Sequence, residues 1–343
     1  MPKSSKNKTI FNNKQGIPLF LAVWLANSDY HNGSDKYPGK EVISATSIMK
    51  PTKQAILAIR AKAQRDSIDH KTDLEDQIAS SVGTAVHGAV EDVWTHAKKW
   101  KSGMRNLGFD ENVIQKFMIN PSKEDLNADI TPVYIEKRSF REIDGVVISG
   151  MFDGCMDGQL FDIKTTSCYG WTSNDKHTDY AIQGSIYRWL NPDLITSDTV
   201  TICYYFTDWN KYKAQANPNY PQSKIRHDSY PLMSLEDTEA YLKHRIAMFN
   251  LNKDLKEADI TPCNDEDRWY SGSEYRFFAD GSKVNAPLAR ATRVFKGANA
   301  KVEAEAEKAA TPGSAYVHLK GVSKACQYCD GYALCTQAEK EVL

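Results

Sequence analysis

The chain has 343 residues, of which 43 are lysine or arginine and 44 are aspartate or glutamate, giving a formal net charge of −1. This balance excludes a general attraction to nucleic acid or to anionic membranes, so an anionic substrate has to be met by a local patch or a metal ion. The first residues, MPKSSKNKTI, are polar, and no run is apolar enough for a signal peptide or a membrane span. We therefore expect a soluble cytoplasmic protein, with no membrane partner, made of one large domain and an appendage.

Residues 1–42 are predicted to be an N-terminal extension in which Pro18–Ala26 (PLFLAVWLA) forms a short buried helix or strand. From Ser44, the sequence SATSIMKPTKQAILAIRAKAQ begins with serine and threonine capping candidates and continues as a basic amphipathic segment. Its cations either contact phosphate or line a solvated helix face, and the sequence favours neither alternative.

The segment Gly83–Trp100 (GTAVHGAVEDVWTHAKKW) is predicted to be a helix. Apolar residues recur along it at helical spacing and are expected to form a core stripe: Val86, Val90, Val93 and Ala97. His87 projects from the adjacent face together with Glu91, four residues later. A single histidine beside an apolar stripe is more often a hydrogen-bonded core residue than a ligand, so this helix alone does not make His87 a metal ligand.

The central stretch Glu136–Thr166 (EKRSFREIDGVVISGMFDGCMDGQLFDIKTT) contains two tight-turn signals, Asp144-Gly145 and Asp157-Gly158. Asp-Gly between short runs of valine, isoleucine, phenylalanine and methionine favours a two-residue type I′ turn. The stretch is therefore predicted to be an antiparallel meander of three strands.

Counting outward from these turns places Asp153 opposite Asp162 on one side and opposite Glu136 on the other. Like charges about 5 Å apart on neighbouring strands repel, so a row of three carboxylates makes sense if a cation binds to it. Lys164 shares a face with Asp162 because strand side chains alternate, and a divalent metal with a lysine beside carboxylates is suited to phosphodiester hydrolysis. The alternative is that Asp153 is an ordinary turn residue and that Asp162 and Lys164 form an exposed ion pair.

Two further helices and a strand are predicted after the meander. Asp179–Leu190 (DYAIQGSIYRWL) should be a helix that ends at Asn191-Pro192, and Thr199–Asp208 (TVTICYYFTD) should be a buried strand. Ser234–Asp237 (SLED) resembles a capping box and opens a helix that reaches about Leu255. This succession indicates an α/β fold, with a mixed β-sheet core flanked by helices over residues 43–256.

Residues 257–343 are predicted to be a C-terminal cysteine-cluster appendage. The sequence ACQYCDGYALC spaces three cysteines as C-x2-C-x5-C: Cys326, Cys329 and Cys335. Thiols this close in a reducing compartment indicate a metal site, with Cys263 as the candidate fourth ligand. Four thiolates suit an iron–sulfur cluster or, alternatively, zinc, for which His318 is a spare ligand. The other cysteines are expected to be structural: Cys155, Cys168 and Cys203.

Together these residues resemble the motifs of the PD-(D/E)XK nuclease superfamily, and within it the RecB-like exonucleases, which include phage-encoded members. The likeness covers about Ile43–Asp208, and the motifs occur in the family's order. GTAVH carries the family's histidine, here His87, and GMFDG carries its metal-binding aspartate, here Asp153. FDIKT carries the D-x-K element, here Asp162 and Lys164, and AIQGSIY carries the Gln-x3-Tyr helix, here Gln183 and Tyr187.

The resemblance implies a restriction-endonuclease-like fold that binds Mg²⁺ or Mn²⁺ through His87, Asp153, Asp162 and the backbone carbonyl of Ile163. It further implies that Lys164 orients the attacking water and that the nucleic-acid backbone is contacted by Gln183 and Tyr187. Glu136 is added to the metal shell from the pairing argument. The C-terminal cysteines resemble the [4Fe–4S] centre of some RecB-like nucleases, in which the first cysteine often precedes the nuclease motifs; here no cysteine occurs before Cys155.

The expected function is that of a metal-dependent DNA exonuclease, a deoxyribonuclease acting on phosphodiester bonds in phage recombination or replication. DNA and a single-strand annealing or binding protein are the expected partners. One alternative is a structure-specific endonuclease of the same fold. The other is a catalytically inactive nucleic-acid-binding protein with a zinc-stabilised tail, although a decayed site has no reason to keep Asp153, Asp162 and Lys164 together.

Overall fold

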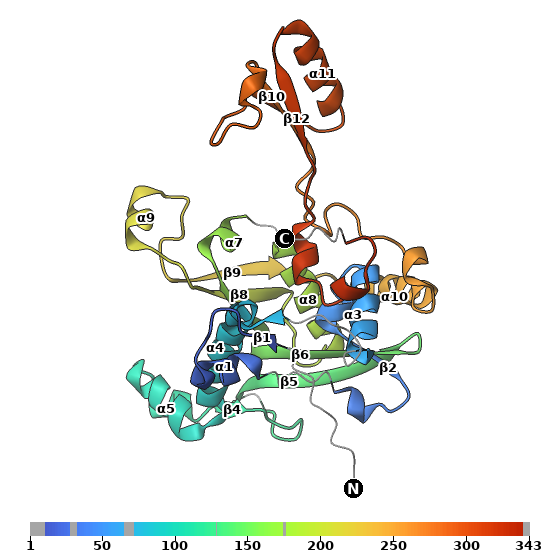
Figure 1. Ribbon diagram of the computed structural model, residues 1–343. Helices are drawn as coiled ribbons and strands as arrows, with labels where there is room; N and C mark the ends of the chain where they lie inside the picture. Colours follow the sequence, from blue (N-terminus) through green and yellow to red (C-terminus); the bar gives the residue numbers. More distant parts are fainter. Residues whose placement is uncertain (1–10, 28–32, 65–71, 128, 174–175, 339–343) are drawn as a thin grey trace. The chain divides into compact units, whose positions relative to one another are not determined.

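The computed structural model describes residues 11–27, 33–64, 72–127, 129–173 and 176–338 (Figure 1). The chain divides into two units: Met1–Lys50 with His70–Met248, and Pro51–Asp69 with Phe249–Leu343. Compared with the expected core, residues 43–256, the first unit also includes residues 1–42 and lacks residues 51–69 and 249–256. No helix in the described part of the chain is both long enough and apolar enough to cross a membrane.

The first unit is built on a mixed sheet of seven strands within the described residues. The strand order is β4-β5-β6-β7-β8-β9, with β2 added beside β6. The pairs β4/β5, β2/β6 and β7/β8 are parallel, and the other pairs are antiparallel. The strands are β2 (Glu41–Ser44), β4 (Phe117–Ile119), β5 (Thr131–Ile143), β6 (Val146–Met156), β7 (Gln159–Thr166), β8 (Thr199–Phe206) and β9 (Ile225–Pro231).

The two Asp-Gly turns have the predicted geometry. Asp144 and Gly145 have φ angles of 48° and 78°, and Asp157 and Gly158 have φ angles of 48° and 79°, as type I′ turns require. A Cβ atom on Gly158 would lie 2.1 Å from the Thr196 hydroxyl oxygen, and the φ angle of 79° strains any residue with a side chain, so glycine is favoured there. The meander and its register, with Ile143 paired to Val146 and Met156 paired to Gln159, are confirmed.

Helices cover the sheet. The crossover between the parallel strands β7 and β8 contains the predicted helix α8 (His177–Leu190), which buries Ile186 and Trp189. The capping box is also confirmed, because the Ser234 hydroxyl accepts from the Asp237 amide at the start of α10 (Leu235–Asn252). The other helices of this unit are α1 (Leu19–Ala26), α2 (Ala45–Met49), α4 (Ile78–Thr95), α5 (Ala97–Asn106), α6 (Glu111–Ile114), α7 (Cys168–Thr172) and α9 (Lys211–Ala216).

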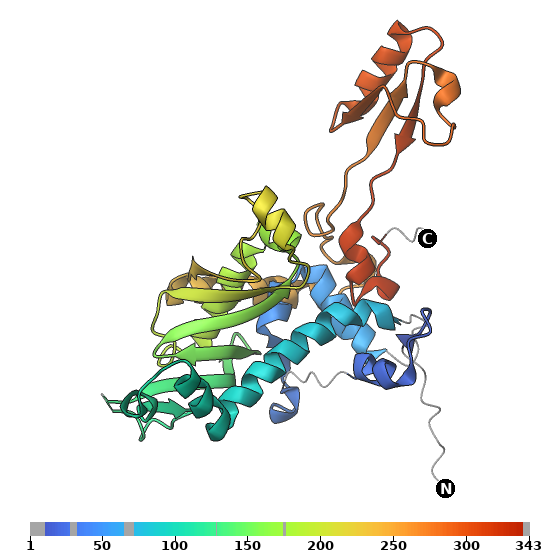
Figure 2. The same cartoon turned by 90° about the vertical axis from the view of Figure 1, so that its left-hand side faces the viewer.

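Two burial predictions are wrong. The α1 segment is a helix, but Phe20 is 96% exposed, and only Ala22 and Leu25 among its residues are buried, against Leu74. In α4, which Figure 2 shows as a long helix running along the sheet, Val90 and Val93 are exposed and no residue is fully buried. Helical spacing fixes which side chains share a face, but another element has to cover that face before it becomes core.

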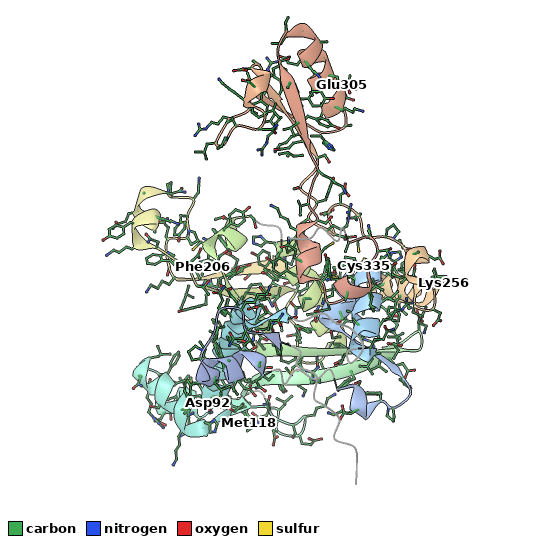
Figure 3. The ribbon with its side chains drawn as sticks, viewed as in Figure 1. Asp92, Met118, Phe206, Lys256, Glu305 and Cys335 are labelled. Atoms are coloured by element: carbon green, nitrogen blue, oxygen red, sulfur yellow. The ribbon has the colours of Figure 1, made fainter. Side chains whose placement is uncertain are left out.

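The second unit contains α3 (Thr52–Ala63) and a small antiparallel sheet of order β11-β10-β12, formed by Arg293–Lys296, Glu274–Phe278 and Ala315–Leu319. The charged helix α11 (Ala300–Ala310) buries Ala300 and Ala304, while Glu305, labelled in Figure 3, is exposed. Short 3-10 turns at Lys324–Tyr328 and Tyr332–Leu334 carry the C-terminal cysteine motif. The predicted amphipathic segment after Ser44 is split, because Pro51 separates α2 from α3.

Candidate active site and cysteine pocket

The candidate active site lies where strands β6 and β7 separate. Their ladder runs from the turn as far as Gly154, which pairs with Phe161, and stops before the expected pair of Asp153 and Asp162. Beyond this point β6 pairs with β2 and β7 pairs with β8. The Asp153 carboxylate occupies the opening, where its Oδ2 accepts the backbone amide hydrogen of Ile163 at 2.7 Å. The separation thus leaves a carboxylate directed at the edge of β7.

Glu136 stands level with Asp153 on the neighbouring strand. Ile135 pairs with Gly154 and Lys137 pairs with Phe152, so the register derived from the turn holds. Glu136 itself has a φ angle of 46°, a left-handed conformation that costs a non-glycine residue about 1–3 kcal/mol and often marks a functional site. This left-handed residue interrupts the ladder between β5 and β6, so the Glu136 side chain does not follow the alternation of a regular strand.

His87, Glu136 and Asp153 converge on one point. One donor atom from each residue lies within 4.8 Å of the other two. His87 comes from α4, and its Nδ1 lies 3.3 Å from Asp153 Oδ1. The hydrogen bond to Asp153 raises the pKa of His87, although burial acts against this. Imidazole nitrogen and carboxylate oxygen are donors that suit a divalent transition metal or magnesium.

The carboxylates of the site are held in an environment that disfavours negative charge. Burial, with repulsion from Asp153 and Glu91, raises the pKa of Glu136 to about 7. Burial also raises the pKa of Asp162, and Asp153 adds to the effect while Lys164 opposes it. A bound cation would offset this repulsion, so the residues present fit a divalent metal.

Asp162 does not belong to the group within 4.8 Å. Its Oδ2 instead lies 2.7 Å from the ammonium nitrogen of Lys164, and its side chain is 6% exposed. Burial acts to lower the pKa of Lys164, but Asp162 and Asp153 raise it overall. Lys164 therefore stays charged at neutral pH, which suits it to binding and orienting anions but not to accepting a proton.

Helix α8 supports this lysine. The Lys164 ammonium lies 3.4 Å from Gln183 Oε1 and 5.4 Å from the centre of the Tyr180 ring. Gln183 in turn donates to the Tyr187 hydroxyl at 2.8 Å. The Tyr187 ring is buried against Phe152, so it supports Gln183 and presents little surface to a polymer. The role of Tyr180 beside Lys164 was not predicted, although Tyr180 shares a helix face with Gln183 and Tyr187.

The four predicted cysteine ligands line one pocket in the second unit. Cys263, Cys326, Cys329 and Cys335 surround it together with residues of α3. Burial raises the pKa of Cys263 to about 11, and nearby Asp267, Cys335 and Cys329 contribute to this shift. Binding to a metal would deprotonate such a thiol.

Several contacts hold the pocket together. The Gln337 side chain accepts the Cys263 amide hydrogen at 3.0 Å and donates to the Cys263 carbonyl at 2.6 Å. Lys53 of α3 pairs with Glu257 at 2.7 Å, and the Thr336 hydroxyl donates to the same carboxylate at 2.7 Å. These contacts tie α3 to the C-terminal segment, and that is why residues 51–69 group with it. They also show that Lys53, 4% exposed, lies on neither a solvated face nor a phosphate-binding one.

The remaining candidate ligands lie elsewhere. His318 is exposed on β12, where it stacks on Tyr275 with ring centres 4.5 Å apart. Cys155 and Cys168 are buried as expected, and Cys203 is only partly buried. Among the described residues, no three cysteine sulfurs lie within 4.8 Å of one another. Four thiolates on one tetrahedral zinc, with Zn–S bonds of about 2.3 Å, would lie about 3.8 Å apart.

Comparisons with known proteins find distant likenesses. No family model matches the sequence, and no curated protein matches it. The crystal structure of SSO0001 aligns with 67% of this chain and 85% of its own, with a TM-score of 0.35 and 15% identity. A phage-related exonuclease from Haemophilus somnus 129PT aligns with 62% of this chain and 93% of its own, with a TM-score of 0.31 and 14% identity. Function therefore has to be argued from the site itself.

Proposed function

We propose that this chain is a metal-dependent nuclease with a PD-(D/E)XK fold that hydrolyses phosphodiester bonds in DNA. The observation that carries the proposal is the convergence of His87, Glu136 and Asp153 beside the buried pair of Asp162 and Lys164. A left-handed glutamate and crowded carboxylates cost folding free energy when no cation is bound. The same arrangement provides a ready set of donors for Mg²⁺ or Mn²⁺, with the Ile163 carbonyl as a further candidate.

A cation bound by these donors would polarise the scissile phosphate and lower the pKa of the attacking water. The residues around it have separate tasks. Lys164, kept charged by Asp162, would donate a hydrogen bond to the water and neutralise charge that develops on the phosphate oxygens. Gln183, supported by Tyr187, would hold the lysine in place through α8, and the face of the Tyr180 ring would stabilise its charge.

The test of this function uses linear end-labelled DNA and covalently closed circular DNA. With Mg²⁺ or Mn²⁺, the protein is expected to release nucleotides from the ends of the linear substrate and to leave the circle intact. Chelator should stop the release, because the carboxylate donors cannot activate water alone. Nicking of the circle would favour the structure-specific endonuclease, and retention of both substrates at full length with either metal would refute the nuclease.

We also propose that the cysteine pocket holds an iron–sulfur cluster, with zinc as the alternative. The support is that four thiols line one pocket and that, among the described residues, no three of their sulfur atoms lie within 4.8 Å of one another. A cluster binds its thiolates through different iron atoms, so it accommodates sulfurs that are too far apart for one zinc ion. Such a cluster would fasten α3 to the C-terminal segment, since both contribute to the pocket wall.

Anaerobically purified protein is therefore expected to be brown and to contain about four iron and four sulfide per chain in the cubane case. Cys329→Ser should lose most of the iron and destabilise the C-terminal segment, because a structural metal site contributes folding energy directly. Cys203→Ser, outside the pocket, is the matched control and should keep its iron. Stoichiometric zinc with no iron would contradict the proposal.

A further inference from the structure

Two short helices project beyond the same edge of the first unit's sheet. Strands β7 and β8 are parallel, and their last residues, Thr166 and Phe206, pair with each other; Phe206 is labelled in Figure 3. The chain continues from β7 into α7 and from β8 into a long excursion, residues 207–226, which contains α9 and which we name the basic arm. Figure 1 shows α7 and α9 on the same side of the unit, with a gap between them.

The basic arm is unlike the rest of the chain in charge. It contains four cations, Lys211, Lys213, Lys224 and Arg226, and one acid, Asp208, whereas the whole chain has a net charge of −1. Arg226 pairs at 2.8 Å with Asp228, just beyond the arm, so the surplus positive charge rests on the three lysines. The Asp208 carboxylate is already engaged, because its Oδ1 accepts the Cys168 amide hydrogen at 2.7 Å at the start of α7. The cations are exposed on the surface. A polyanion would therefore meet a local positive patch on a nearly neutral protein.

Aromatic side chains lie among these cations. Tyr169 of α7 is 78% exposed and Tyr212 of α9 is 80% exposed. Behind them, the Lys224 ammonium lies 5.9 Å from the Trp209 ring centre, and the Arg226 guanidinium carbon lies 4.4 Å from that of Trp171. One exposed tyrosine needs no explanation. Exposed rings accompanied by cations are the features on which unpaired bases stack while their phosphates are neutralised.

The basic arm is also preorganised. The Tyr220 hydroxyl accepts the Asn210 amide hydrogen at 3.0 Å and donates to the Asp208 carbonyl at 3.3 Å, and the Trp209 indole donates to the Pro221 carbonyl at 2.8 Å. The Asn210 side chain accepts from two amides at the start of α9. The backbone that carries Tyr212 is thus held by internal hydrogen bonds, so a ligand would not have to order that backbone.

The position of the arm connects it to the candidate active site. Lys164 precedes Thr166 by two residues on β7, which is about 7 Å at the rise of a strand. We propose that α7 and the basic arm form a stacking platform for single-stranded nucleic acid, which holds an unpaired strand beside Lys164. This role of the platform, to present a strand to the active site, rests on the proposed nuclease function. Duplex fits less well, because its bases are already stacked on one another.

The test measures binding of fluorescent oligo-dT, oligo-U and a hairpin duplex to the full chain in chelator, where no cleavage occurs. Tyr169→Ala/Tyr212→Ala should weaken binding of the single strands by about tenfold to a hundredfold and leave duplex binding within about threefold. Lys211→Gln/Lys213→Gln should reduce the salt dependence of binding by about one to two counterions. Phe20→Ala, a similarly exposed aromatic on α1, is the control and should bind like the wild type.

The comparison of oligo-dT with oligo-U shows which sugar the platform accepts. Weaker binding of either oligonucleotide by the double tyrosine variant supports the platform. Unchanged binding of both single strands, or an equal loss for the duplex, would overturn the platform. Because binding is measured without cleavage, the result is separate from the nuclease test. If the protein degrades linear DNA but binds oligonucleotides equally well without the two tyrosines, the proposed nuclease function stands and the platform is refuted.

Discussion

Replacing Lys164 with alanine is expected to lower Mg²⁺-dependent DNA cleavage by about a hundredfold or more while the protein stays folded. Removing one preorganised donor that faces developing charge typically costs this much in rate. The loss of the cation leaves Asp162 buried without its partner, but the pKa of Asp162 is already raised, so the carboxyl can take up a proton and remain in place. Asp162→Ala should have an effect of similar size, because it removes the group that positions Lys164.

The matched control is Lys99→Ala, which breaks an exposed ion pair with Asp92 on the same unit. Exposed pairs of this kind contribute about 0–1 kcal/mol, and this one is distant in sequence from the β6–β7 opening, so activity should be unchanged. Circular dichroism checks that each variant is folded, and initial rates on end-labelled DNA give the activity. A folded Lys164→Ala protein that cleaves at the wild-type rate would remove the nuclease assignment from this site.

Replacing Lys53 with methionine is expected to lower the free energy of unfolding of the second unit by about 3 kcal/mol. The methionine keeps most of the volume but leaves Glu257 without its cation, and breaking one side of a buried ion pair usually costs this much. Lys53 is almost fully buried, and its ammonium also donates to the Glu257 carbonyl at 3.1 Å. Lys301→Met, from the exposed pair with Glu305 on α11, is the control and should change stability by under about 1 kcal/mol.

The same pair makes a prediction about pH. Burial acts to raise the pKa of Glu257, but hydrogen bonds from Lys53 and Thr336 lower it overall to about 2, against about 4.3 in the unfolded chain. The stabilisation is therefore fully present above about pH 5 and is lost as pH falls toward 2. Urea unfolding should show wild type more stable than Glu257→Gln at pH 7, with the difference closing between about pH 5 and 2. A difference that stays constant over this range would contradict the ion-pair origin.

The sequence by itself determined the features that depend on neighbouring residues. Asp-Gly turns need two left-handed residues, so Asp144-Gly145 and Asp157-Gly158 fixed where the meander turns and which residues face each other across it. The Ser234 capping box likewise fixed the start of α10 from groups three residues apart. Hydrogen bonds between residues close in sequence form almost independently of the rest of the fold. For this reason, the position of Glu136 opposite Asp153 could be predicted by counting residues from the turn.

Only the tertiary structure decided how far those local rules extend. The ladder between β6 and β7 stops at Gly154, and farther along β6 the strand β2 takes the same edge at Val146–Ser149. Asp162 therefore pairs with Lys164 and does not face Asp153 across a ladder. The exposure of α4 and the burial of Lys53 depend on which elements pack beside them. Such contacts join residues far apart in the chain, as Lys53 and Glu257 are, about two hundred positions apart. Closing that loop costs conformational entropy, which only the combined contacts of the assembled unit offset.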